Sequence, residues 1–187
     1  MNWSVVFVTK EWEPVDLLRH YRHDWLNQMQ LIKGNLALGK IERVETLLED
    51  IIIQSKNEAK LSNMEGKTLA EKLLTFNWEP HDFHLNFEVI SEPSGFSRNE
   101  PAILKVSERL FAWFDRQCQT GADNHLLFVI NSDNGKPVIE FDFQGKLNLD
   151  AFSIEEIEQM SAGLPNVYMK EVELGNHECF IRIHFSD

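Results

Sequence analysis

The stretch "RHDWLNQMQLIKGN" (Arg22–Asn35) decides the fold of the first third of the chain. Apolar residues within and around it recur at steps of three and four, the period of an amphipathic α-helix. This apolar seam consists of Leu18, Tyr21, Trp25, Met29, Ile32 and Leu36. At about 100° per residue, His23 falls roughly 160° away from the seam. The sequence therefore predicts a histidine on the polar face of this helix, where packing does not require one.

Proline and glycine residues predict where this helix and a second one begin and end. We expect the first helix to begin at Pro14, because proline is favoured at the first helical position, and to end near Gly39, which suits the position after the last turn. A second amphipathic pattern runs from about Ile41 to Ser62, with Gly66 beyond it. Two helices joined by so short a connection predict an antiparallel helical hairpin.

The predicted hairpin has more apolar surface than two helices can cover. Leu26, Leu47 and Ile52 widen the apolar face beyond a single partner helix. One solution is a second copy of the chain, so that two hairpins form a four-helix bundle in a homodimer. The other is that the C-terminal part of the same chain covers the hairpin. Periodicity alone favours neither solution.

The pattern changes near Gly66, after which short β-type runs alternate with turn signals and helices. We expect a mixed sheet with a few helices against one face, and hence an α+β chain with a hairpin over 11–66 and an α/β domain over 67–187. The expected strands are Leu85–Ile90, His125–Ile130, Val138–Phe143 and a terminal hairpin turning at Gly175-Asn176. The expected helices are Pro101–Cys118 and a short one from Ser153.

Composition restricts the classes of partner. The 187 residues carry a formal net charge of -12, which argues against nucleic acid or an anionic membrane as the main partner. The two cysteines, Cys118 and Cys179, form no CxxC pattern and no disulfide framework, so we expect a cytoplasmic protein. No apolar stretch is long enough to span a bilayer.

A polar stripe surrounds His23 on the predicted helix, formed by Asp16, His20, Asn27, Gln30 and Gly34. For an arbitrary helix, such a stripe is more often a solvated face than a site. Gly34 argues for a site, because glycine costs about 1 kcal/mol relative to alanine inside a helix and has no packing role on an outer face. A closely approaching partner surface would explain it.

Charge gives the second argument for a site. Residues 16–40 form a locally basic patch within an acidic protein, which suits an acidic partner. The patch carries Arg19, Arg22, Lys33 and Lys40 against Asp16 and Asp24.

The chemistry that fits an exposed histidine here is phosphoryl transfer. A neutral imidazole is a good nucleophile near pH 7. Asp24, the next residue, can orient the ring or accept its proton, and Asn27 lies one turn along the same face. Each of these two side chains can equally be an ordinary surface residue.

The block "RHDWLNQMQLIKGNLALGK" (Arg22–Lys40), with "LSN" (Leu61–Asn63) and "LTFNW" (Leu74–Trp78), resembles the sporulation initiation phosphotransferase B family of bacilli. The H-D-x-x-N pattern also resembles the dimerisation and phosphoacceptor element of sensor histidine kinases. The resemblance implies paired hairpins in a four-helix bundle and a C-terminal domain like a degenerate kinase ATP-binding domain. It further implies a phosphorelay between two response-regulator receiver domains.

The resemblance also implies residue roles. His23 would accept the phosphoryl group from the aspartate of one receiver domain and pass it to the aspartate of another. Arg22, Asp24, Asn27, Gln30 and Lys33 would lie near the docked regulator, beside Arg19 and Gly34 of the basic, open face. No cofactor is expected on this chain, since the receiver domain would supply Mg²⁺.

The second half lacks the sequence features of an ATP site. The helix expected over Pro101–Cys118 has no asparagine to carry magnesium, and no G-x-G pair occurs in the chain. "DFQG" (Asp142–Gly145) is a poor match to a glycine-rich phosphate loop. The sequence therefore favours transfer without autokinase activity. A kinase fragment that turns over ATP and a dimeric adaptor that binds regulators without transfer remain the alternatives. A metal site at His81-x-x-His84 is not expected, because no further ligands complete it.

Overall fold

The computed structural model describes residues 13–91, 96–151 and 153–186. The chain divides into two compact units, one ending at Ile53 and the other beginning at Gln54. Among the described residues, no helix is both long enough and apolar enough to cross a membrane. The domain boundary predicted near residue 66 stays a prediction. Within the predicted domains, residues 11, 12, 92–95, 152 and 187 lie outside the described ranges.

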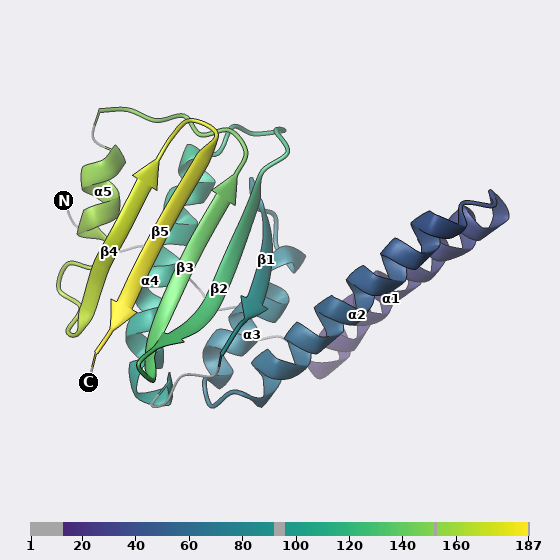
Figure 1. The fold of residues 1–187 in the computed structure, drawn as a ribbon, viewed down its shortest axis with the longest axis horizontal. Helices are drawn as coiled ribbons and strands as arrows, with labels where there is room; N and C mark the ends of the chain where they lie inside the picture. The colour runs from purple at the N-terminus through teal and green to yellow at the C-terminus, as the bar shows by residue number, and fades with distance from the viewer. Residues whose placement is uncertain (1–12, 92–95, 152, 187) are drawn as a thin grey trace. The chain divides into compact units, whose positions relative to one another are not determined.

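The two predicted hairpin helices are present. Helix α1 spans Pro14–Ala37 and helix α2 spans Ile41–Asn63 (Figure 1). Gly39 has a φ of 70°, a left-handed conformation that glycine adopts without strain, so the predicted helix end is confirmed. The backbone N–H of Gly39 donates to the carbonyl of Leu36 at 3.0 Å, which closes the last turn.

The second unit is built on one five-stranded sheet with the order β1-β2-β3-β5-β4. The strands are β1 His84–Val89, β2 His125–Asp133, β3 Lys136–Gln144, β4 Val167–Leu174 and β5 Glu178–Phe185. The helices are α3 Lys67–Thr75, the 3₁₀ turn η1 Phe76–Trp78, α4 Phe96–Gln117 and α5 Ser153–Gln159. Strand β1 runs parallel to β2, with α4 between them in the chain, and every other pairing is antiparallel. The predicted α+β class is confirmed.

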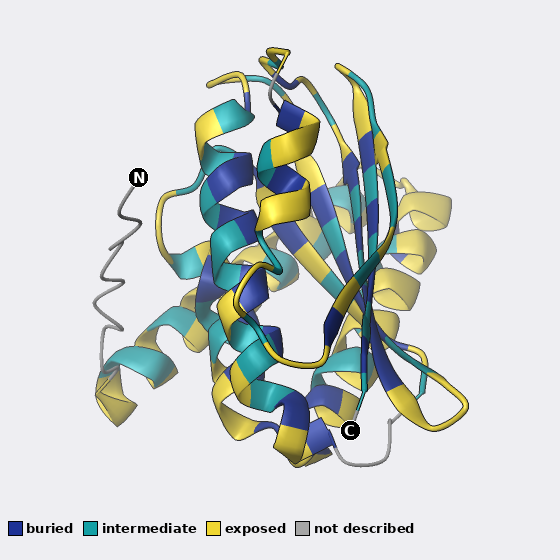
Figure 2. Ribbon diagram, turned by 90° about the vertical axis from the view of Figure 1, so that its left-hand side faces the viewer, coloured by how far each residue is buried: buried dark blue, intermediate teal, exposed yellow. Residues whose placement is uncertain are grey.

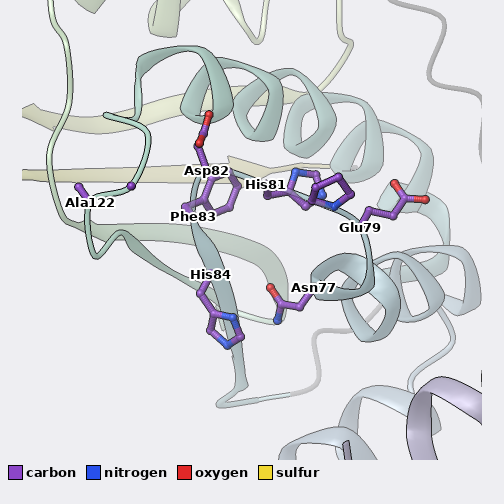
Figure 3. A pocket seen from close by; sticks show the side chains of 9 residues that line it. Asn77, Glu79, His81, Asp82, Phe83, His84 and Ala122 are labelled. Atoms are coloured by element: carbon purple, nitrogen blue, oxygen red, sulfur yellow. The ribbon is translucent and has the colours of Figure 1, made fainter. Parts of the chain in front are cut away.

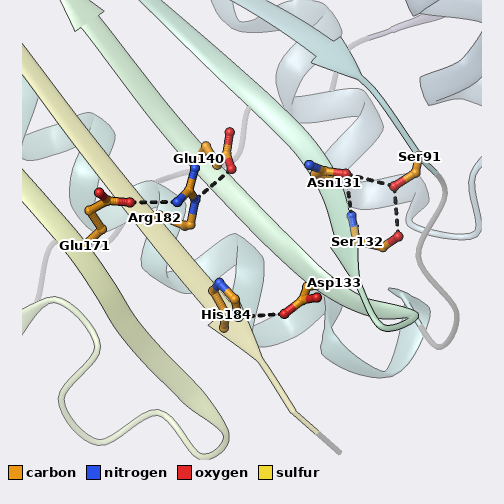
Figure 4. A network of polar contacts seen from close by, with 8 residues as sticks. All are labelled: Ser91, Asn131, Ser132, Asp133, Glu140, Glu171, Arg182 and His184. Carbon is orange, nitrogen blue, oxygen red and sulfur yellow. Dashed lines mark hydrogen bonds and ion pairs between the residues drawn. The ribbon is translucent and has the colours of Figure 1, made fainter.

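The core lies between one face of the sheet and its helices, where buried residues line both layers (Figure 2). Trp113 and Phe114 of α4 are fully buried, and the Phe114 ring stacks on Phe143 of β3 with centroids 5.2 Å apart. The opposite face of the sheet carries an ion-pair network. There Arg182 of β5 donates to Glu140 at 2.8 Å and to Glu171 at 2.7 Å, which links three strands (Figure 4).

One helix of this unit was not predicted, and the predicted start of another was wrong. Helix α3 was not expected, although Leu69, Ala70 and Leu73 form a short buried stripe. Helix α4 begins at Phe96 rather than at Pro101, so it contains an asparagine, Asn99. Burial of Phe96 (2% exposed) stabilises the extra turn and offsets the hydrogen bond that the proline inside the helix cannot donate.

Gly145 provides a test of how tightly the end of β3 is packed. An added Cβ would lie 2.9 Å from the backbone Cα of Asn124 and 2.8 Å from Cζ of Phe143. Asn124 cannot move freely, because its side-chain amide donates to the carbonyls of Asp82 (2.8 Å) and Gln119 (3.1 Å). Gly145→Ala should therefore lower the free energy of unfolding by about 1–3 kcal/mol in urea titrations.

The control for this substitution is Gly175→Ala, where the nearest atom to the added Cβ is a carbonyl oxygen at 3.5 Å, an ordinary contact. The free energy of unfolding of that variant should stay close to that of the parent protein. Equal stability of the two variants would contradict the packing described for Gly145.

Candidate functional site

Helix α1 separates an apolar side from the side that carries His23. The His23 side chain is 71% exposed, as expected for a residue about 160° from the seam. The seam itself is only partly covered: Leu18 is 66% exposed and Trp25 is 40% exposed. None of the residues of α1, all of which are described, is buried.

The imidazole of His23 has two polar neighbours on one of its nitrogens. Nδ1 lies 3.2 Å from Nδ2 of Asn27 and 3.4 Å from Oδ1 of Asp24. The other nitrogen, Nε2, takes part in neither contact. The predicted grouping of His23, Asp24 and Asn27 is therefore present in the structure.

These neighbours bear on the tautomer of the ring. A carboxylate only accepts hydrogen bonds, so Asp24 favours a proton on Nδ1, which leaves the lone pair on Nε2. The Asn27 amide can present either its nitrogen or its oxygen to Nδ1 and can therefore serve either tautomer. The arrangement can thus expose a nucleophilic nitrogen toward solvent while the opposite side of the ring is held.

The predicted cationic residues do not all lie on the same stripe. Arg19 donates to Oδ1 of Asp16 at 2.6 Å, so part of its charge is compensated. Arg22 and Lys33 are exposed and lie roughly 80–100° around the helix from His23. Both lie on the same side of the histidine stripe, whereas Gln30, also exposed, lies within it.

A shallow groove of about 480 Å³ follows the same face of α1 toward the hairpin turn. Its lining is Asn27, Gln30, Leu31, Gly34, Asn35 and Leu38. A Cβ added to Gly34 would have no atom within 4 Å, so this glycine faces open space, as predicted. Sequence reasoning missed the two exposed leucines, Leu31 (57%) and Leu38 (70%). Both leucines lie outside the apolar seam in the sequence pattern, and this position could have indicated that they are exposed.

In the second unit, the "DFQG" segment and the asparagine of α4 are packed rather than open. Gly145 of "DFQG" abuts Asn124 and Phe143, and Asn99 of α4 is 7% exposed. Burial raises the pKa of the Cys118 and Cys179 thiols to about 12, so neither is a thiolate near neutral pH.

A depression of about 400 Å³ contains both histidines of the His81-x-x-His84 motif (Figure 3). Nδ1 of His81 lies 2.8 Å from Oδ2 of Asp115, and the His84 side chain points in a different direction from that of His81. Burial and, to a smaller extent, the charge of His125 lower the pKa of His84. No group of three or more His, Cys, Asp or Glu side chains in the described part of the chain could hold a metal ion.

Solved structures similar to this chain include histidine kinases, at low identity. The Acinetobacter baumannii histidine kinase AdeS is 13% identical, with a TM-score of 0.44, over 88% of this chain and 97% of that one. The blue-light activated histidine kinase EL346 of Erythrobacter litoralis is 12% identical, with a TM-score of 0.45, over 95% of this chain and 61% of that one.

Sequence comparison is more specific. A family model described as the α-helical domain of SpoOB-type sensor kinases matches residues 8–64, and one described as the C-terminal part of sporulation initiation phosphotransferase B matches residues 65–186. The sporulation initiation phosphotransferase B of Bacillus subtilis (strain 168) is 37% identical over 173 residues, which cover 91% of this chain and 88% of that protein. The chain belongs to the sporulation initiation phosphotransferase B family.

Proposed function

We propose that this protein is a phosphorelay phosphotransferase that moves a phosphoryl group from the aspartate of one response-regulator receiver domain to His23, and from His23 to the aspartate of a second. The observation that carries the proposal is the His23 side chain itself. It is 71% exposed on the polar face of α1, with Nδ1 beside Asp24 and Asn27 and with Nε2 outside both contacts.

The chemistry is an in-line displacement at phosphorus. The Nε2 lone pair attacks the aspartyl phosphate as the bond between phosphorus and the aspartate oxygen breaks, and the aspartate leaves as a carboxylate. The proton stays on Nδ1, where the Asp24 carboxylate stabilises the positive charge that the ring develops. The second transfer reverses these steps with a new receiver aspartate. Mg²⁺ would belong to the receiver domain, and no cofactor is proposed for this chain.

The outer face of α1 is suited to an acidic partner. Arg22 and Lys33 border the histidine stripe on one side, and the groove at Gly34 leaves room for the backbone of α1 to be approached closely. Both receivers would use this one face, because both must reach the same histidine.

We further propose that two copies pair through the apolar side of their hairpins to form a four-helix bundle. In the single chain, Leu18, Met29 and Leu48 are 66%, 40% and 43% exposed, and they would be covered in such a dimer. Because His23 lies on the opposite side of α1, the pairing would leave both histidines accessible.

His23→Gln should abolish acceptance of phosphate from a labelled receiver domain and leave the fold unchanged, because the exposed side chain fills no cavity. The measurement is transfer of label to the protein, with circular dichroism as the check on folding. His20→Gln, one turn earlier on α1, is the matched control and should still accept label. Uptake of label by a folded His23→Gln protein would disprove the assignment.

Leu48→Lys should weaken the dimer, since each copy loses about 1.5–3 kcal/mol of apolar burial and gains a charge at the interface. Sedimentation at micromolar concentration should show a shift toward monomer. Asp50→Lys introduces the same side chain roughly 200° further around α2 and should leave the dimer intact. A parent protein that sediments as a monomer would refute the hairpin dimer.

Gly34→Trp should slow transfer from and to receiver domains by about tenfold or more, because the indole fills the groove beside the proposed contact. Phosphorylation of His23 by phosphoramidate, a small donor, should be nearly unchanged. Gly34→Ala should be stabilising by up to about 1 kcal/mol, since helix propensity improves. Equal loss with both phosphate donors would show damage to α1 rather than blocked docking.

Titration with Mg-ATP in a calorimeter should show no saturable binding below about millimolar concentration, because "DFQG" offers no open glycine-rich cradle of backbone N–H groups. The same titration of an active histidine kinase is the positive control. A micromolar isotherm for this protein would favour the kinase alternative.

A further inference from the structure

Strand β1 lies at one edge of the sheet, and among the residues that the structure describes it pairs with β2 alone (Figure 1). The N–H groups of His84 and Ile90 donate to carbonyls of Asn124 (2.8 Å) and Ile130 (2.9 Å), on the β2 side. In a parallel pair, alternate residues direct their backbone groups to opposite sides. The backbone groups of Leu85, Phe87 and Val89 therefore face away from β2, toward the open edge.

The side chain of Asn77 occupies the first of these outward positions. Its Nδ2 donates to the carbonyl of Leu85 at 2.7 Å, and its Oδ1 accepts the N–H of Leu85 at 2.9 Å. One amide thus makes both hydrogen bonds that a neighbouring strand would make. Asn77 is held in place by its neighbour Phe76, whose side chain is 5% exposed and stacks on His81 with ring centroids 3.8 Å apart.

The last turns of α2 occupy the third outward position. Lys60 Nζ donates to the carbonyl of Val89 at 2.8 Å, and Asn57 Oδ1 accepts the N–H of Val89 at 3.5 Å. Leu61, beside Lys60 in the same helix, is 1% exposed in the core of the second unit, so this stretch of α2 is anchored. Of the three outward-facing positions on β1, Phe87 is the one whose backbone groups neither Asn77 nor α2 bonds.

The opposite edge of the sheet is irregular. Strand β4 has a register shift between Met169 and Glu171, and the intervening Lys170 is exposed. Bulges and lysines at an edge both disfavour pairing with another strand.

We infer that Asn77 and Lys60, with Asn57, prevent β1 from adding the β1 strand of a second copy, and that they thereby confine self-association of this chain to its hairpin. A second strand would need Leu85, Phe87 and Val89 as one continuous ladder, and two of the three are already bonded. The inference rests on the proposed hairpin dimer only for the expected size of the native assembly.

The test opens the edge in the full chain with Asn77→Val and Lys60→Met together. A second self-pairing interface, in addition to the hairpin, should produce species larger than the parent assembly, growing with concentration in sedimentation, because each dimer could then join further copies through its sheet edges. Asn86→Val is the matched control, since it places the same side chain on β1 without touching the edge bonds. A folded double variant with the parent's size distribution would overturn the inference.

Hydrogen exchange keeps the test decisive if the double variant does not fold. In the single variant Asn77→Val, the Leu85 amide should exchange about tenfold faster or more, while the Ile90 amide, which donates to β2, should keep its rate. An unchanged Leu85 rate would also overturn the inference. Phosphate acceptance by His23 should be unaffected in the folded edge variants. Failure of the inference about the β1 edge can therefore be distinguished from failure of the phosphotransfer proposal.

Discussion

The separation of α1 into an apolar side and a polar side is the constraint on which the site, the proposed dimer and the proposed docking surface all depend. A helix repeats every 3.6 residues, so a seam at steps of three and four leaves a fixed opposite face. His23 occupies that face with a side chain that is 71% exposed. The same geometry leaves apolar residues such as Leu18 exposed on the opposite side of α1, where the proposed dimer would cover them. One periodic pattern thus allows stable pairing and accessible chemistry in a single pair of helices.

The second unit has a different physical character. Its aromatic core is fully buried, its sheet edge at β1 is bonded by side chains, and its tightest glycine, Gly145, is packed against Asn124. These features describe a scaffold that is closed around its own core. Family membership links this scaffold to the SpoOB-type hairpin in one chain. The proposed chemistry needs only the hairpin and the receiver domains.

How far the sequence predicted the structure depended on how local the signal was. Pro14 and Gly39 predicted the bounds of α1 because proline and glycine act on the backbone where they stand. The strands were found from apolar alternation and turn residues. Helix α3 and the first turn of α4 were missed because tertiary burial, of Leu69 and Phe96 for example, outweighs local preference there.

The site was predictable in part for the same reason. Asp24 and Asn27 are fixed relative to His23 by helical geometry, so their proximity followed from their spacing. The sequence predicted one feature of the groove at Gly34 and missed another. The open space at the glycine was expected, but the exposure of Leu31 and Leu38 depends on which side of α1 is left uncovered in three dimensions. The cover of the β1 edge joins Asn77 to Leu85 and Lys60 to Val89, and no local pattern connects those positions.

The most direct test of the central claim is a two-step transfer followed at the level of the intermediate. The protein is labelled by one phosphorylated receiver domain, separated from it, and then mixed with a second receiver domain. The proposal predicts an isolable label on His23 that is acid-labile and alkali-stable, and that moves to the second receiver as it leaves the protein in equal amount. Label that reaches the second receiver without appearing on His23, or label on His23 that cannot leave it, would contradict the role of this histidine as the carrier.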